Sequence, residues 1–205
     1  MVNRKGIIFL FPGQGAQYPG MGLDLAEASA AARAVFDTAS AALGKDMVRL
    51  IRDSDGETLK RTDVSQSALC AASLAAAAFL KERGIVPAAC AGFSLGEYAA
   101  LVSAGVIGLE DCFALTEARG RAMQDAVDRI AAENGADQAD GGAADDANGG
   151  APGMAAVLGL APERVEELIA QWKSAGALEG LYAANINSPK QTVVSGSAAS
   201  LAEAE

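Results

Sequence analysis

Apolar and polar positions follow two patterns over residues 1–130. Short apolar runs with the length of a buried strand are followed by longer stretches in which apolar residues recur at helical spacing. A chain that alternates strands and helices in this way is typical of an α/β fold with a mostly parallel sheet. The predicted elements are the strands Ile7–Phe11 and Val86–Gly92 and the helices Ala26–Leu43, Val64–Arg83, Leu95–Ser103 and Leu109–Ile130.

Residues 153–205 show a different order of elements. The pattern predicts a strand, a helix with Pro162 near its start, two further strands, and a final helix that Ser197 can cap. The order β-α-β-β-α is that of a ferredoxin-like domain without its last strand. We therefore predict an incomplete ferredoxin-like small domain, with elements at Met154–Leu160, Glu163–Lys173, Tyr182–Asn187, Thr192–Ser195 and Ser197–Glu205.

The segment 131–152 separates these two regions. Residues 133–150 are rich in Gly, Ala and acidic residues and include no bulky apolar side chain. Such a segment cannot bury enough apolar surface to offset the entropy lost on ordering, so a flexible insertion is predicted. Its aspartates do not have the spacing of an EF-hand loop, and we predict no metal site.

Composition limits the partners. The 205 residues carry a formal net charge of -10 and include no histidine. The negative charge argues against binding to nucleic acid or to an anionic membrane surface. The three cysteines stand in apolar contexts without metal-ligand spacing, which is typical of a reducing compartment. The apolar stretches Ile7–Phe11 and Ala68–Leu80 are too short for a signal sequence or a membrane span, so we expect a cytoplasmic protein.

The most informative motif is the sequence Gly92-Phe93-Ser94-Leu95-Gly96, between a predicted strand and a predicted helix. In a nucleophile elbow, a serine at such a sharp turn exposes its hydroxyl above the end of the sheet. Free N–H groups and the positive dipole end of the next helix would stabilise negative charge on an attacked acyl group. A turn serine that only caps the helix remains the structural alternative.

Two other features accompany this motif. The first strand runs into the glycine loop Pro12–Gln17, which lacks the third glycine of a dinucleotide fingerprint and the Gly-Lys-Ser/Thr of a P-loop. Arg119 precedes Gly120 inside a predicted helix, where a glycine costs about 1 kcal/mol relative to alanine. Close packing would explain the glycine. Taken alone, Arg119 is typical of a solvated helix charge.

Four segments in order carry a family resemblance: FPGQGAQ, GFSLGEYAAL, EARGRAMQ and AANINSPKQTVVSG. Together they resemble the malonyl-CoA:acyl-carrier-protein transacylases of the acyltransferase superfamily. The resemblance implies an α/β-hydrolase-like core with a parallel sheet plus a ferredoxin-like small domain. It also implies malonyl transfer from coenzyme A to the phosphopantetheine thiol of acyl carrier protein, in fatty acid biosynthesis. The coenzyme A thioester would be a substrate, and no cofactor would stay bound.

The resemblance also implies roles for individual residues. Ser94 would be the nucleophile, and Arg119 would pair with the free malonyl carboxylate. A guanidinium fork can donate two parallel hydrogen bonds to a carboxylate, which would select malonyl over acetyl groups. Gln14 and the Leu95 N–H match the oxyanion-hole region of the family, while Gln66 and Asn185 fall in segments that line its pocket.

Two departures from the family pattern matter. Phe93 stands where the family usually has a histidine that is not the catalytic base. The histidine that activates the serine lies farther along the family's sequence than Glu205. We therefore expect these 205 residues to be an N-terminal fragment that lacks the C-terminal part. A serine hydroxyl needs an adjacent base, so we expect weak or no activity from the fragment alone.

Three alternatives remain open at this point. An acyltransferase of polyketide synthesis would share all four segments. A serine hydrolase of α/β or patatin type would share the elbow but would not need a carboxylate-binding arginine. An inactive acyl-binding module would fit the absence of histidine.

Overall fold

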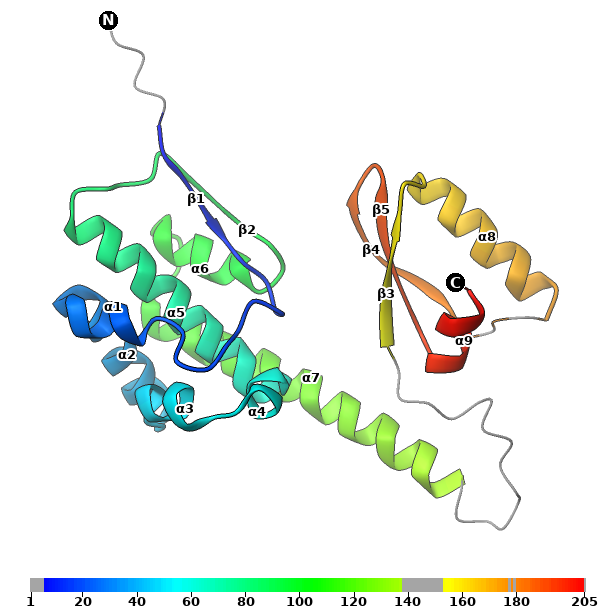
Figure 1. Ribbon diagram of the computed structural model, residues 1–205, viewed down its shortest axis with the longest axis horizontal. Coiled ribbons are helices and arrows are strands. Elements are labelled where there is room, and N and C mark those ends of the chain that lie inside the picture. The colour runs from blue at the N-terminus through cyan, green and yellow to red at the C-terminus, as the bar shows by residue number, and fades with distance from the viewer. Residues whose placement is uncertain (1–5, 138–152, 177, 179, 205) are drawn as a thin grey trace, which may run out of the picture. The chain divides into compact units, whose positions relative to one another are not determined.

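The computed structural model describes residues 6–137, 153–176, 178 and 180–204 (Figure 1). The chain divides into two compact units, which we call unit 1 (Met1–Asp128) and unit 2 (Arg129–Glu205). Unit 1 contains the elbow and the glycine loop Pro12–Gln17, and unit 2 contains the segment that includes Asn185.

The sheet of unit 1 is a parallel pair of short strands. Strand β1 (Ile8–Phe11) lies beside β2 (Ala89–Gly92), in a register that pairs Ile8 with Ala89 and Phe11 with Gly92. The pairing confirms the predicted α/β class with a parallel sheet. Because parallel strands end at the same edge, the loop after β1 and the turn after β2 are neighbours. The Phe93 N–H extends this contact by donating to the Phe11 carbonyl at 3.1 Å.

Helices surround this pair and form one apolar core. Helix α5 crosses the middle of unit 1 and contacts α2 and α6 (Figure 1). Phe36, Met47 and Phe113 are among the fully buried side chains that pack in this core. The helices that begin in unit 1 are α1 (Leu23–Ala28), α2 (Ala30–Leu43), α3 (Met47–Asp53), α4 (Gly56–Lys60), α5 (Thr62–Glu82), α6 (Gly96–Ser103) and α7 (Leu109–Asp137), whose last residues belong to unit 2.

The prediction of one helix over Ala26–Leu43 is wrong, because the chain breaks at Ser29. The Ser29 backbone is extended (φ -150°, ψ 125°), and its Oγ accepts the Ala32 N–H at 3.1 Å. A serine side chain satisfies the first free N–H groups of a helix better than it fits inside one, so α2 starts anew here. The short helices α3 and α4 were not predicted either, although Asp46 and Asp55 cap their first turns.

Helix α5 is long and apolar enough, by length and composition, to cross a membrane. The helix is longer than the apolar stretch Ala68–Leu80, which by itself is too short to span a membrane. However, 61% of its most apolar window is buried against the rest of the protein. Its apolar character is therefore that of a core helix in unit 1.

Two cysteines meet in this core. Cys70 on α5 and Cys112 on α7 are buried as free thiols with their Sγ atoms 3.3 Å apart. The hydrogen bond with Cys112, together with burial, raises the pKa of the Cys70 thiol. Both residues behave as small buried groups at the α5–α7 contact. Cys90 on β2 is half-buried.

Unit 2 has the element order predicted for it. Strands β3 (Gly153–Leu158), β4 (Tyr182–Ser188) and β5 (Gln191–Gly196) form an antiparallel sheet in the order β3-β5-β4. Helices α8 (Pro162–Ser174) and α9 (Ala198–Glu203) complete the order β-α-β-β-α. Side chains from both helices and from the sheet share one small apolar core, which includes Val165, Ile169, Leu181, Val194 and Leu201.

The helix predicted at Leu109–Ile130 extends farther, to Asp137. It therefore occupies the first residues of the segment 131–152 that was predicted to be a flexible insertion. Residues 138–152 lie outside the described residues.

Gly120 is the point at which α7 comes closest to the start of α5. A Cβ atom at Gly120 would lie 2.6 Å from the Thr62 carbonyl oxygen and 3.1 Å from Cγ of Gln66. Thr62 Oγ1 also donates to the Gly120 carbonyl at 3.2 Å. The glycine therefore allows two helix backbones to pack closer than any side chain would permit.

We predict that Gly120→Ala destabilises the protein by about 1–3 kcal/mol, as overpacking does, despite the better helix propensity of alanine. The matched control is Gly56→Ala in α4, where an added Cβ would meet no atom within 4 Å. That variant should be neutral or slightly stabilising. Urea unfolding followed by circular dichroism measures both changes. Equal stability of the two variants would contradict the close α5–α7 contact.

Candidate active site

Ser94 lies in the turn between β2 and α6 with an unusual backbone conformation. Its φ angle is 51°, in the left-handed region that costs an ordinary residue about 1–2 kcal/mol. Hydrogen bonds hold the turn: the Gly96 N–H donates to the Phe93 carbonyl at 2.9 Å, and the Glu97 N–H donates to the Ser94 carbonyl at 3.1 Å. The serine is exposed to solvent. This strained, exposed turn is the geometry of a nucleophile elbow.

The glycines on either side of the turn have a steric reason. A Cβ at Gly92 would overlap the Gly96 backbone, and a Cβ at Gly96 would overlap the backbone of Phe11 and Pro12. Strand, turn and helix can therefore pack together only without side chains at these positions. The capping alternative is wrong, because Leu95 is the N-cap of α6 and the helix has no side-chain cap.

Arg119 lies beside the serine hydroxyl. Its Nη2 donates to Ser94 Oγ at 3.4 Å, and its Nη1 donates to the side-chain oxygen of Gln66. Arg119 is half-buried, and these two hydrogen bonds hold its guanidinium in place. It is not the solvated helix charge that Arg119 alone would suggest.

Gln66 and Gln14 continue this chain of contacts. Gln66, on α5, is fully buried, and its Nε2 donates to Gln14 Oε1 at 2.8 Å. Gln14 belongs to the loop after β1. The structure therefore brings together Gln14, Gln66, Ser94 and Arg119, which come from positions far apart in the sequence.

Backbone donors lie next to these side chains. Leu95 anchors the turn with a side chain that is 1% exposed, and its N–H is at the start of α6. Within the described part of the chain, this N–H donates no hydrogen bond to another protein group. A free N–H beside a serine hydroxyl can stabilise the oxyanion that forms when the hydroxyl attacks a carbonyl.

The remaining predicted site residue, Asn185, belongs to unit 2, and its role stays a prediction. It lies on β4 of unit 2, exposed and opposite Val193 of β5. Phe93 is 56% exposed, and its ring lies over Gly13, where an added Cβ would be 2.7 Å away. Gly13 thus makes room for the aromatic ring of Phe93.

Neither a base nor a metal site accompanies the serine in the described residues. Arg119 is the side chain that hydrogen-bonds to Ser94 there, and the sequence has no histidine. Among the same residues, no group of three or more His, Cys, Asp and Glu could hold a metal ion. The aspartates at 140, 145 and 146 lie outside the described residues.

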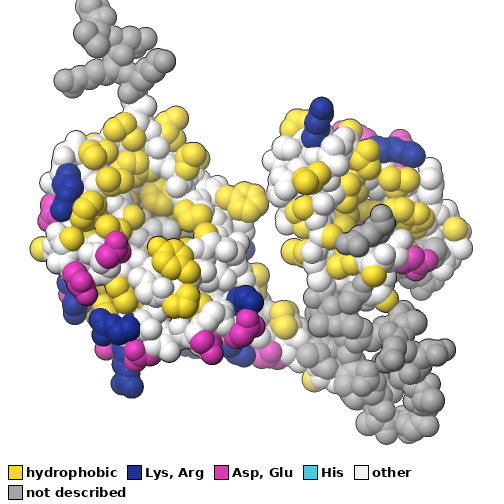
Figure 2. All heavy atoms as spheres, in the orientation of Figure 1, with side chains coloured by type: hydrophobic (Ala, Val, Ile, Leu, Met, Phe, Trp, Pro, Cys, Tyr) yellow, Lys and Arg dark blue, Asp and Glu magenta, His cyan; other side chains and the backbone are white. Residues whose placement is uncertain are grey.

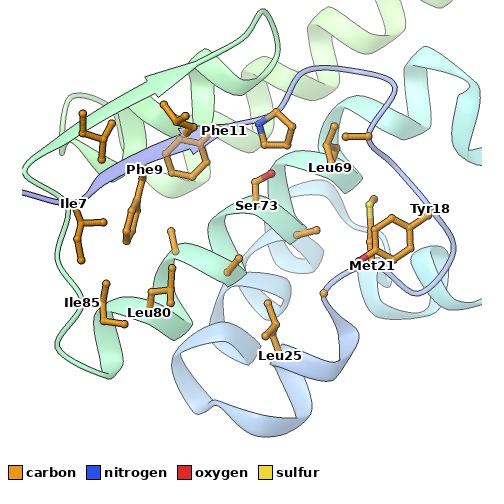
Figure 3. Close-up of a pocket in the computed structure, with 18 residues that line it drawn as sticks. Ile7, Phe9, Phe11, Tyr18, Met21, Leu25, Leu69, Ser73, Leu80 and Ile85 are labelled. Atoms are coloured by element: carbon orange, nitrogen blue, oxygen red, sulfur yellow. The ribbon is translucent and has the colours of Figure 1, made fainter.

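An apolar groove of about 520 Å³ is lined by β1, the loop that follows it, α1 and α5 (Figure 3). Phe9 and Phe11 of β1 face Leu80 and Leu69 of α5 across it, and Tyr18 closes one end. On this face of unit 1, apolar side chains gather near β1, while charged side chains gather toward α3 and α4 (Figure 2). The groove was not predicted, because its residues come from β1, α1, α5 and the loops that join them. Neither Ser94 nor Arg119 lines it.

The described site combines a nucleophile-elbow turn, a free backbone N–H and a guanidinium at the Ser94 hydroxyl. Comparison with known proteins shows the family. Residues 8–179 match the model of the acyl transferase domain family, so the chain belongs to that family.

Individual relatives within this family have more specific activities in their names. The malonyl CoA-acyl carrier protein transacylase of Bacillus subtilis is 38% identical over 192 residues, which cover 94% of this chain and 54% of the relative. The crystal structure of that transacylase from Clostridium perfringens has a TM-score of 0.76 at 35% identity, covering 97% of this chain and 56% of the other.

A second similar structure is a malonyl-transacylase in complex with a type II polyketide synthase acyl-carrier protein. Its TM-score is 0.71 at 31% identity, and the match covers 97% of this chain and 57% of that one. This chain therefore spans about half the length of the relatives that it matches.

The strain at Ser94 gives a test that does not depend on activity. At an ordinary helix position such as the exposed Ala34, replacing alanine by glycine lowers stability by about 1 kcal/mol. At Ser94 we predict the reverse: Ser94→Gly should be more stable than Ser94→Ala by about 1 kcal/mol, because glycine adopts φ 51° without strain. Urea unfolding of the four proteins measures both differences. If Ser94→Ala is the more stable variant, the turn is not strained.

Proposed function

We propose that this chain contributes the nucleophile and the carboxylate-binding arginine of a malonyl-CoA:acyl-carrier-protein transacylase. The observation that carries the proposal is the 3.4 Å contact between Arg119 Nη2 and Ser94 Oγ. In a malonyl group, one methylene separates the reacting carbonyl carbon from the free carboxylate. A carbonyl at Ser94 therefore places that carboxylate within reach of the guanidinium, which can bind it through two hydrogen bonds.

The chemistry would proceed in two transfers. Ser94 Oγ attacks the thioester carbonyl of malonyl-CoA, and its proton passes to a base. The Leu95 N–H and the Gln14 loop stabilise the tetrahedral oxyanion, and coenzyme A leaves as the thiol after protonation. The phosphopantetheine thiol of acyl carrier protein then attacks the Ser94 ester by the same route in reverse, which restores the hydroxyl.

The relatives support this choice of substrates and partner. They are named for malonyl-CoA and acyl carrier protein, and one similar structure is a malonyl-transacylase in complex with a carrier protein. The proposal includes no bound cofactor, because the coenzyme A thioester enters the reaction as a substrate. We place the reaction in the cytoplasm, where fatty acid biosynthesis would supply the carrier. The similar structure with a polyketide synthase carrier protein supports an acyltransferase of polyketide synthesis as the second candidate.

Arg119 argues against a serine hydrolase, since hydrolysis does not require a guanidinium at the nucleophile. The absence of histidine has a separate consequence. Without a general base, the 205 residues should form the Ser94 ester slowly, with only the residual rate that oxyanion stabilisation and binding provide. Added imidazole can take the place of the base.

We predict that malonyl-CoA with imidazole gives a malonyl ester on Ser94, detected by mass spectrometry of the intact protein and its peptides. The ester should accumulate faster as imidazole concentration rises, and Ser94→Ala should give none. Release of free malonate without a stable ester would indicate a hydrolase. A complete lack of ester at every imidazole concentration would favour an inactive acyl-binding module.

The same assay tests selectivity. Arg119→Ala should lower the ratio of malonyl to acetyl transfer about 10- to 100-fold, the effect of one charged hydrogen-bonded pair. Arg121→Ala is the matched control, because Arg121 lies on the same helix but pairs with Glu117 at 2.8 Å. It should leave the ratio unchanged. An unchanged ratio in Arg119→Ala would remove the proposed role of the guanidinium.

A further inference from the structure

We infer that Gln66 is a positioning residue that sets the hydrogen-bond direction of the whole site without contacting the substrate. This inference rests on the proposed function. Gln66 is fully buried, so its side chain is closed to a ligand. Both ends of its amide are occupied, one by Arg119 and the other by Gln14.

The direction of these hydrogen bonds follows from the chemistry of the groups. A guanidinium can only donate, so the Gln66 oxygen must face Arg119. The Gln66 nitrogen must then face Gln14, and it finds the Gln14 oxygen at 2.8 Å. The remaining end of Gln14 is its Nε2, which can only donate. One charged residue thus determines the orientation of two neutral amides.

The result is a chain of hydrogen bonds that presents an N–H donor at each end. Arg119 Nη2 is at Ser94 Oγ, and Gln14 Nε2 makes no hydrogen bond to a protein group within the described ranges. Gln14 is exposed in the loop after β1. If its amide turned over, the site would present an oxygen, which repels a developing oxyanion. Gln66 prevents this reversal because its nitrogen requires an acceptor.

The packing around Gln66 makes its position rigid. Thr62 lies one turn earlier on α5, and its backbone is close to that of Gly120 on α7. The Thr62 N–H and Oγ1 each lie 3.2 Å from the side-chain oxygen of Gln124. These contacts hold the two helices together one turn away from the Gln66–Arg119 contact.

Two substitutions separate this role from simple packing. Gln66→Met keeps the shape and removes both hydrogen bonds. Gln66→Glu keeps an acceptor toward Arg119 but removes the donor toward Gln14, so Gln14 should reverse and donate to the new carboxylate. Ser67→Ala is the matched control, since Ser67 is equally buried on the same helix and its Oγ has no partner.

The experiment measures imidazole-supported esterification of Ser94 by malonyl-CoA and by acetyl-CoA in each variant. Gln66→Met should lower the malonyl to acetyl ratio about tenfold, since Arg119 loses its fixed orientation. Gln66→Glu should lower both rates and also the ratio, because its carboxylate partly neutralises Arg119. Ser67→Ala should change neither. Gln14→Ala should slow both esterifications about equally and leave the ratio intact.

A second measurement needs no ligand. In nitrogen-15 NMR spectra, Gln66→Glu should shift the side-chain amide signals of Gln14, whereas Ser67→Ala should leave them in place. If wild type shows no malonyl preference while these shifts occur, the proposed function fails and the positioning role stands. If wild type prefers malonyl and the folded Gln66→Met keeps that preference, the positioning role is wrong. Should both Gln66 variants unfold, a Gln14→Ala variant with an altered ratio would overturn it.

Discussion

The hydrogen bond from Arg119 to the buried amide of Gln66 is the contact on which the site depends. It joins α7 to α5 where Gly120 lets their backbones meet, and it holds a cation 3.4 Å from the Ser94 hydroxyl. A free arginine side chain would lose much rotamer entropy on binding a carboxylate. Here folding has already imposed that order, so the guanidinium is arranged before any acyl group arrives.

Glycine provides the second requirement of the site, which is backbone proximity. Because Gly92 and Gly96 have no side chains, the backbones of the strand, the turn and the helix can occupy the space that a Cβ would fill. The resulting turn holds Ser94 at φ 51°. Burial of the Leu95 side chain offsets the cost of this strained conformation. Unit 1 thus stores unfavourable backbone energy at the residue that the proposed chemistry uses.

Much of the fold could be read from the sequence, because strand and helix periodicities are strong in β1, β2, α5 and unit 2. The break at Ser29 was missed, since apolar spacing continues through a residue whose side chain prefers to cap a helix. Ser94 was found from its glycines, and Arg119 and Gln14 from their family segments. The hydrogen bonds through Gln66 could not be predicted, because a buried glutamine has no periodic signal and its partners lie more than 50 positions away.

A crystal structure of the Ser94→Ala variant with malonyl-CoA tests the central claim most directly. We expect the terminal carboxylate to accept two hydrogen bonds from Arg119, with Gln66 still bound to the same guanidinium and the thioester carbonyl at residue 94. A malonyl group whose carboxylate faces solvent, or one bound away from Arg119, would contradict the account.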